Sequence, residues 1–74
     1  MSRDEIINEI PKWRKLIYGI VLKAGFVADD AEDLTSDIIL KAMEKVVEFD
    51  STRATVQTWI GSIARWTAVE RRRH

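Results

Sequence analysis

The amino-acid sequence predicts an all-α fold, a compact three-helix domain whose first helix is interrupted at a proline. Apolar residues recur at helical spacing in three segments, and neither a strand-like alternation nor an internal repeat is present. With 74 residues the chain has room for one hydrophobic core. Its 46% hydrophobic and 32% charged residues suit a folded domain rather than a disordered tail. We therefore expect residues 1–74 to form a single domain.

The first helical segment is expected between Ser2 and Gly25. Ser2 and Glu5 have the spacing of a capping box. Pro11 lacks the amide proton that a helix interior needs, so the helix either kinks near Glu9 or restarts with Pro11 in its first turn. We favour a short lead-in before the main helix, which Gly25 ends in a left-handed conformation. The inward positions of the main helix are Trp13, Leu16, Ile17, Ile20, Val21 and Ala24.

The second helix is expected to have its cap at Asp29 or Asp30 and to end near Glu48. Its core stripe is Ala31, Leu34, Ile38, Ala42 and Val46, flanked by Thr35, Ile39, Met43 and Val47. Residues 49–54 have the composition of a polar turn around one aromatic residue, and Thr55 can cap the third helix. That helix turns Val56, Trp59, Ile60, Ile63, Ala64 and Thr67 inward, and Ser62, Arg65, Trp66, Val69, Arg72 and Arg73 outward. We expect its arginines to form one basic face.

Charge is segregated along the chain, although the formal net charge is zero. Residues 26–50 hold eight acidic residues against two lysines, whereas residues 51–74 hold five arginines against one glutamate. Two solvated helix faces would explain this pattern, and so would two different partners. Composition alone leaves both interpretations open.

Catalysis is not expected, because the residue types that it needs are missing or isolated. The chain has no cysteine, its only histidine is His74, and its three glycines match no phosphate-binding loop. Asp30, Asp33 and Asp37 share one helix face, but no oxygen-rich loop with a glycine accompanies them, so an acidic docking stripe is favoured over a metal site. We expect no metal and no cofactor.

The longest apolar runs are too short to cross a bilayer, and the acidic N-terminus lacks the pattern of a signal peptide. We therefore expect a cytoplasmic protein without membrane contact.

Two separated blocks of sequence carry a family resemblance. Residues 30–42, Asp-Ala-Glu-Asp-Leu-Thr-Ser-Asp-Ile-Ile-Leu-Lys-Ala, resemble the second conserved region of sigma-70-type factors. Phe49 and Asp50, followed by residues 55–65, are similar to the loop and promoter helix of the extracytoplasmic-function group, in the same order and spacing. Pro11 also stands where many of these proteins have a proline. The resemblance covers almost the whole chain.

The resemblance implies a binding module rather than an enzyme. Such a domain docks on the clamp coiled coil of the RNA polymerase core and captures the non-template strand of the minus-ten promoter element in transcription initiation. An anti-sigma factor is a further partner that the resemblance admits. The implied polymerase contacts are Asp33, Ser36, Asp37 and Leu40. The implied DNA contacts are Phe49, Ser51, Thr52 and Gln57 around the captured base, with Arg53, Ser62, Arg65, Trp66, Arg72 and Arg73 along the strand.

The aromatic residues near these sites admit more than one role. Phe49 either faces the captured base or acts as a staple that fixes the loop to the core. Trp59 is expected in the core, and Trp66 on the surface. The family commonly has Asn at position 66, Gln in place of Ser36 and Gly in place of Ala54.

Two alternative functions remain open at this point. A phage-borne or degenerate sigma relative would bind polymerase without reading DNA. A duplex-reading helix-turn-helix protein would need a tight turn before the third helix, which the sequence does not provide. Complete sigma factors of this group carry a second, helix-turn-helix domain that these residues cannot encode, and the uncapped helical pattern at the end favours a trimmed chain.

Overall fold

Helices account for all the regular secondary structure in the computed structural model, which describes residues 2–73. The elements are α1 (Arg3–Glu9), the 3₁₀ segment η1 (Ile10–Trp13), α2 (Arg14–Lys23), α3 (Ala28–Glu44), the 3₁₀ segment η2 (Val46–Glu48) and α4 (Val56–Arg72). The predicted all-α class is confirmed. The first predicted helix corresponds to α1, η1 and α2 together.

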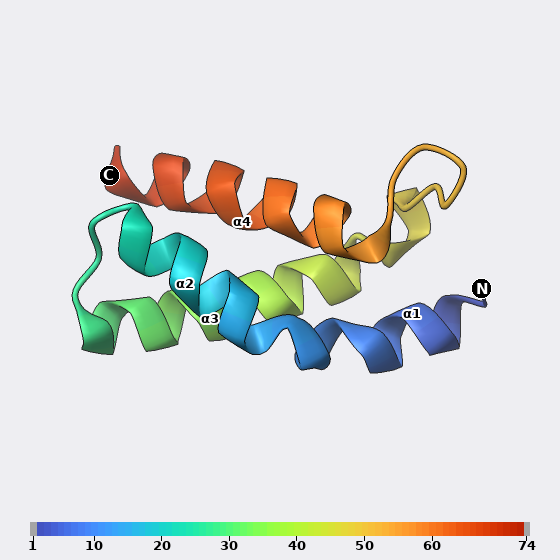
Figure 1. Cartoon of the computed structure of the whole chain (residues 1–74), viewed down its shortest axis with the longest axis horizontal. Helices are drawn as coiled ribbons and strands as arrows, with labels where there is room; N and C mark the ends of the chain where they lie inside the picture. The colour runs from blue at the N-terminus through green and yellow to red at the C-terminus, as the bar shows by residue number, and fades with distance from the viewer. Residues whose placement is uncertain (1, 74) are drawn as a thin grey trace.

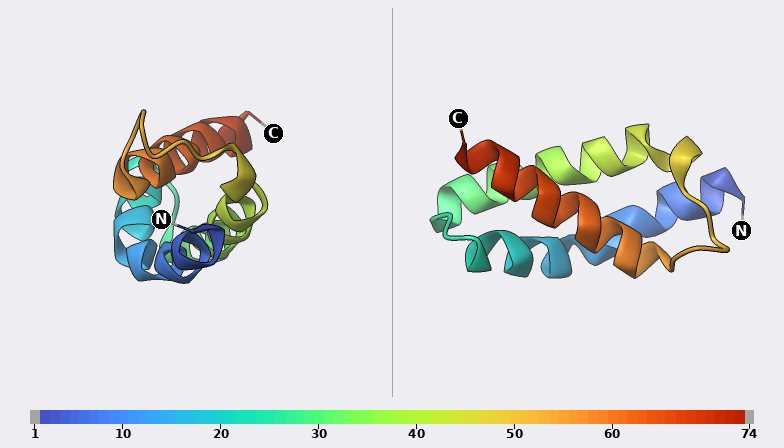
Figure 2. Two further views of the ribbon diagram at one scale, coloured as in Figure 1. Left: turned by 90° about the vertical axis from the view of Figure 1, so that its right-hand side faces the viewer. Right: turned by 90° about the horizontal axis from the view of Figure 1, so that it is seen from above.

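The helices lie roughly along one long axis, in a molecule with extents of 35 × 19 × 17 Å. The chain runs along α1 and α2, returns along α3, and runs back along α4 (Figure 1). Helices α2, α3 and α4 contact one another in all three pairs. Seen from above, α4 crosses the other helices obliquely (Figure 2). Both sides of α4 therefore border a neighbouring helix.

Local sequence chemistry explains the broken first helix. The Ser2 hydroxyl accepts a hydrogen bond from the Glu5 amide at 3.3 Å, as the capping box predicts. The chain tightens into η1 with Pro11 in its first turn, where a missing amide proton costs no helical hydrogen bond. Gly25 then follows α2 with φ of +101°, which confirms the predicted left-handed stop.

Helix α3 differs from its prediction at both ends. Its N-cap is Val27 in extended conformation, without a side-chain cap, so the expected caps at Asp29 and Asp30 are wrong. These carboxylates lie in the first turn instead, where they interact favourably with the positive end of the helix dipole. The helix also ends at Glu44 rather than near Glu48, and η2 follows it.

The tighter 3₁₀ turn changes which side chains face inward, because it rotates the chain by a different angle per residue. Val46 stays buried, but Val47 is 63% exposed, so its predicted place beside the core is wrong.

The core lies between α2, α3 and α4. Its largest fully buried side chains are Ile10, Ile17, Leu34, Ile38, Ile60, Val21 and Thr35. Thr35 satisfies its hydroxyl by donating to the Ala31 carbonyl at 2.6 Å. The predicted burial of Leu34, Ile38 and Ala42 is confirmed. Several predicted inward residues are only partly buried at the edge of this core, namely Trp13, Leu16, Ile20, Ala24, Met43, Trp59 and Ile63.

Candidate docking face and nucleic-acid interface

The loop of residues 49–55 projects from one end of the bundle, between η2 and α4 (Figure 1). Its shape is fixed by Asp50. The Asp50 carboxylate accepts the Thr52 amide at 2.9 Å and the Thr52 hydroxyl at 2.6 Å. The Asp50 carbonyl accepts the amides of Arg53 at 3.0 Å and Ala54 at 3.3 Å. The loop is therefore a closed turn held by its own hydrogen bonds.

The hydrogen bonds from Thr52 also stabilise the ionised form of the Asp50 carboxyl. The Thr52 hydroxyl, and after it the Thr52 amide, lower the pKa of the Asp50 carboxyl below its ordinary value of 3.8. At neutral pH the group is ionised, so it can only accept hydrogen bonds. In this hydrogen bond the Thr52 hydroxyl is therefore the donor and Asp50 the acceptor.

A hollow of about 440 Å³ lies beneath this loop. Three of the predicted base-contacting residues line it: Phe49, Ser51 and Gln57. Glu9 and Trp13, from the start of the chain, line it as well. Thr52 and Arg53 are exposed and do not line the hollow. The structure thus brings together three of these five candidates and adds two residues that the sequence did not assign to a site.

Phe49 lies against both the loop and the core. Its ring centroid is 5.1 Å from that of Trp59, with the ring planes tilted by 49°. Both rings are partly buried and pack against the core cluster. Phe49 also lines the hollow, so its two predicted roles, staple and base contact, are compatible.

The N-terminus of α4 is fixed beside the hollow by a side-chain cap. Thr55 Oγ1 accepts the Thr58 amide at 3.1 Å, which confirms the predicted cap. Gln57 is thereby held in the first turn of α4.

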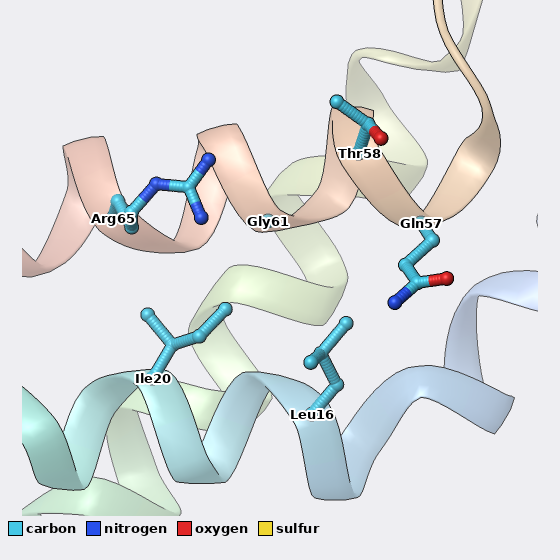
Figure 3. Close-up of a pocket in the computed structure, with 6 residues that line it drawn as sticks. All are labelled: Leu16, Ile20, Gln57, Thr58, Gly61 and Arg65. Atoms are coloured by element: carbon cyan, nitrogen blue, oxygen red, sulfur yellow. The ribbon is translucent and has the colours of Figure 1, made fainter.

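A second hollow, of about 210 Å³, lies between α2 and α4 (Figure 3). Leu16 and Ile20 point from α2 toward α4, and Gln57 points from α4 toward the start of α2 (Figure 3). The Arg65 guanidinium lies next to Gly61, where a Cβ atom would be 3.4 Å from Arg65 Nη1. A side-chain methyl at position 61 would thus be in ordinary van der Waals contact with the Arg65 guanidinium.

A third hollow, of about 410 Å³, continues in the same direction and shares Ile20 and Arg65 with the second. Lys23 and Val69 also line it. The first and second hollows share Gln57. We call the three hollows together the α2–α4 furrow. It runs from the loop to the end of α2 and carries the cations Arg65 and Lys23.

The opposite side of α4 holds Ser62 and Trp66. Lys41 Nζ from α3 lies 5.0 Å from the centroid of the Trp66 ring, which is a cation–π geometry. A shallow hollow of about 250 Å³ adds Lys45. The outward positions of α4 are exposed as predicted, but they face two different neighbours. Arg65 and Arg72 both lie on the α2 side of α4, whereas Ser62 and Trp66 lie on the other side, so one basic face formed by the arginines stays a prediction.

The arginines at the end of α4 contact other parts of the chain. Arg71 forms an ion pair with Asp37 at 3.0 Å. Arg72 donates a hydrogen bond to the Ala24 carbonyl at the end of α2. Arg73, at the C-cap, is exposed. Arg72 was predicted to contact DNA, but its guanidinium caps α2.

The four predicted docking residues lie on one side of α3, because their spacing follows the helical repeat. They are Asp33, Ser36, Asp37 and Leu40, of which Ser36 is partly buried and the others are exposed. Arg14 from α2 donates to the Ser36 hydroxyl at 3.1 Å, and Arg71 from α4 pairs with Asp37. An arginine from each flanking helix thus contacts this acidic face.

Across residues 2–73, no helix is both long and apolar enough to cross a membrane. No three histidine, cysteine, aspartate or glutamate side chains in this part of the chain are placed to hold a metal ion. The single histidine, His74, lies outside the described residues.

An all-α domain with an acidic helix face and a polar loop above a furrow is a small helical binding module. Residues 10–74 match the sigma-70 region 2 family, and the chain belongs to this family. It is 41% identical, over 49 residues, to the ECF RNA polymerase sigma factor RpoE of Cereibacter sphaeroides. This likeness identifies the domain as the extracytoplasmic-function type. The matched part is 66% of this chain and 27% of that relative. No solved structure matches the chain.

Proposed function

We propose that this domain docks on the RNA polymerase clamp through α3 and captures the non-template strand of the melted minus-ten promoter element at the loop and α4. The observation that carries the proposal is the hollow beneath residues 49–55, which shares Gln57 with the neighbouring hollow between α2 and α4. Family membership supports the same function.

Single-stranded DNA needs cations along its backbone and apolar or aromatic surfaces for its bases. The loop hollow offers the ring of Phe49, the hydroxyl of Ser51 and the amide of Gln57. Arg65 and Lys23 follow along the furrow. Turning a base out of the stack costs a few kcal/mol, and contacts of this kind would offset that cost.

Docking on a protein would use the acidic face of α3. Asp33 and Asp37 carry the charge, and Leu40, which is 58% exposed, supplies an apolar contact. A coiled coil lined with cations would be attracted to these carboxylates over roughly 10 Å at 0.1 M salt. Neither binding step makes or breaks a covalent bond, so the proposed role is not enzymatic.

Fluorescence anisotropy with a labelled single-stranded minus-ten oligonucleotide tests strand capture. We expect affinity to fall with added salt, and Arg65→Ala to weaken binding and lower the salt slope by about 1. Arg3→Ala removes an exposed arginine from α1, outside the furrow, and should leave binding unchanged. Absence of binding, or an equal loss in both variants, would contradict the proposal.

A second candidate function is polymerase docking without DNA reading. It is favoured by the engagement of Arg71 and Arg72 within the fold. This candidate predicts that a clamp coiled-coil peptide binds the domain, that Asp33→Ala weakens the complex, and that no strand binds. The matched control is Asp4→Ala, which removes an exposed carboxylate from α1.

A further inference from the structure

We infer that Glu9 makes the hollow beneath the loop selective for a nucleobase with an exocyclic amino group, adenine or cytosine. The inference rests on the proposed strand capture at this hollow, and it names the class of base that the hollow takes.

Glu9 belongs to a part of the chain that the family match does not include. It is the last residue of α1, and the match begins at residue 10. Helix α1 contacts η2, which directly precedes the loop, so Glu9 is held next to the loop. Glu9 is partly buried and lines the hollow together with Ser51 and Gln57. No ion pair within residues 2–73 takes up its carboxylate.

The polar groups around the hollow differ in what they can recognise. The Ser51 hydroxyl and the Gln57 amide each donate and accept hydrogen bonds, so they fit either an amino or a keto group. An ionised carboxylate only accepts. Glu9 therefore matches the N6 amine of adenine or the N4 amine of cytosine. A keto oxygen of thymine or guanine at the same place would face the carboxylate lone pairs and lose its own hydrogen bond.

The charge of Glu9 gives a second reason to expect a hydrogen bond between its carboxylate and the captured base. A carboxylate in a site for an anionic strand repels phosphate, so it lowers affinity for every strand unless the base returns a hydrogen bond. Replacing the carboxylate with an amide removes the repulsion. The amide also adds an N–H group that can donate a hydrogen bond to the keto oxygen of thymine or guanine. Glu9→Gln should therefore strengthen binding of the disfavoured bases.

The test is anisotropy with labelled oligo-dT that carries one central guest: dA, dC, dG, or a purine nucleotide without an amino group. For the natural chain we expect the dA and dC guests to bind about tenfold tighter than all-dT. The amine-free purine should lose this gain, although its ring stacks like adenine. Glu9→Gln should abolish the preference, and Glu44→Gln, which removes an equal charge from α3 outside the hollow, should retain it.

Equal binding of dA and the amine-free purine would overturn the inference, and so would a preference that survives Glu9→Gln. In both cases the strand still binds, so the proposed function stands. Failure of every oligonucleotide to bind the natural chain would instead contradict strand capture itself. Far-UV circular dichroism on heating checks that the Glu9→Gln chain is folded.

Discussion

Replacing Gly61 with alanine tests how much space lies beside α4 in the furrow. Gly61 is buried in the middle of α4, where glycine costs about 0.8–1.0 kcal/mol relative to alanine. The atoms nearest to the added Cβ would be those of the Arg65 guanidine group, with Nη1 at 3.4 Å. The end of a flexible, exposed side chain can move away at little cost. We therefore expect Gly61→Ala to stabilise the domain by about 0.5–1 kcal/mol.

Thermal unfolding followed by circular dichroism measures this gain, which corresponds to a few degrees in Tm for a domain of this size. The matched control is Gly19→Ala in α2, where a Cβ would meet nothing within 4 Å and the gain should be similar. Because the added Cβ lies at an ordinary van der Waals distance from Arg65, both variants should retain strand binding. Destabilisation by Gly61→Ala, with stabilisation by Gly19→Ala, would show that the space beside Gly61 is closed to a methyl group.

Three further predictions concern the ends of the helices and the loop. Gly25→Ala should cost about 1–2 kcal/mol in urea unfolding, because φ at this position is +101°. The hydrogen bonds from Thr52 to the Asp50 carboxylate should be fully formed above pH 3.8 and weaken as the pH falls through the lowered pKa of Asp50, which an NMR titration of the Thr52 amide would detect. Arg71→Ala should cost no more than about 1 kcal/mol, and the cost should shrink with salt, because its ion pair with Asp37 is exposed.

The features predicted best are those that depend on one residue or on residues close to it in the sequence. The caps at Ser2 and Thr55, the interruption at Pro11 and the stop at Gly25 each follow from one residue's own chemistry. Burial along α3 and α4 followed because the helical repeat fixes which side chains share a face. Such arguments need no knowledge of how the helices cross.

The ends of α3 were predicted less well, because competing local signals exist there. Two aspartates at positions 29 and 30 are good caps, yet the chain uses the extended residue Val27 and leaves both carboxylates in the first turn. The shift from α3 to η2 after Glu44 carries no proline or glycine signal. The exposure of Val47 follows from that shift.

Contacts between residues that are far apart in the chain could not be predicted from the sequence. The hydrogen bond from Arg72 to Ala24 joins residues that are 48 apart in the chain, and its partner is a backbone carbonyl that any residue would present. Lys23 is a site candidate because α2 forms one side of the furrow. Glu9 is one because the end of α1 lies beside the loop. Neither position can be read from the sequence. Separating Ser62 and Trp66 from Arg65 likewise required the positions of α2 and α3 on either side of α4.

The charge segregation has a structural cause as well as a proposed functional one. The acidic start of α3 and the basic end of α4 lie at the same end of the molecule (Figure 1), and Arg71 joins them through Asp37. Each charge also suits the dipole of its own helix. Part of the segregation therefore stabilises the fold. The proposed functions also use charges that no ion pair within residues 2–73 takes up, namely Asp33 on α3 and the cations Arg65 and Lys23 in the furrow. Ser36 and Asp37 are docking candidates that serve the fold too, through Arg14 and Arg71, so a cationic partner at Asp37 must compete with Arg71.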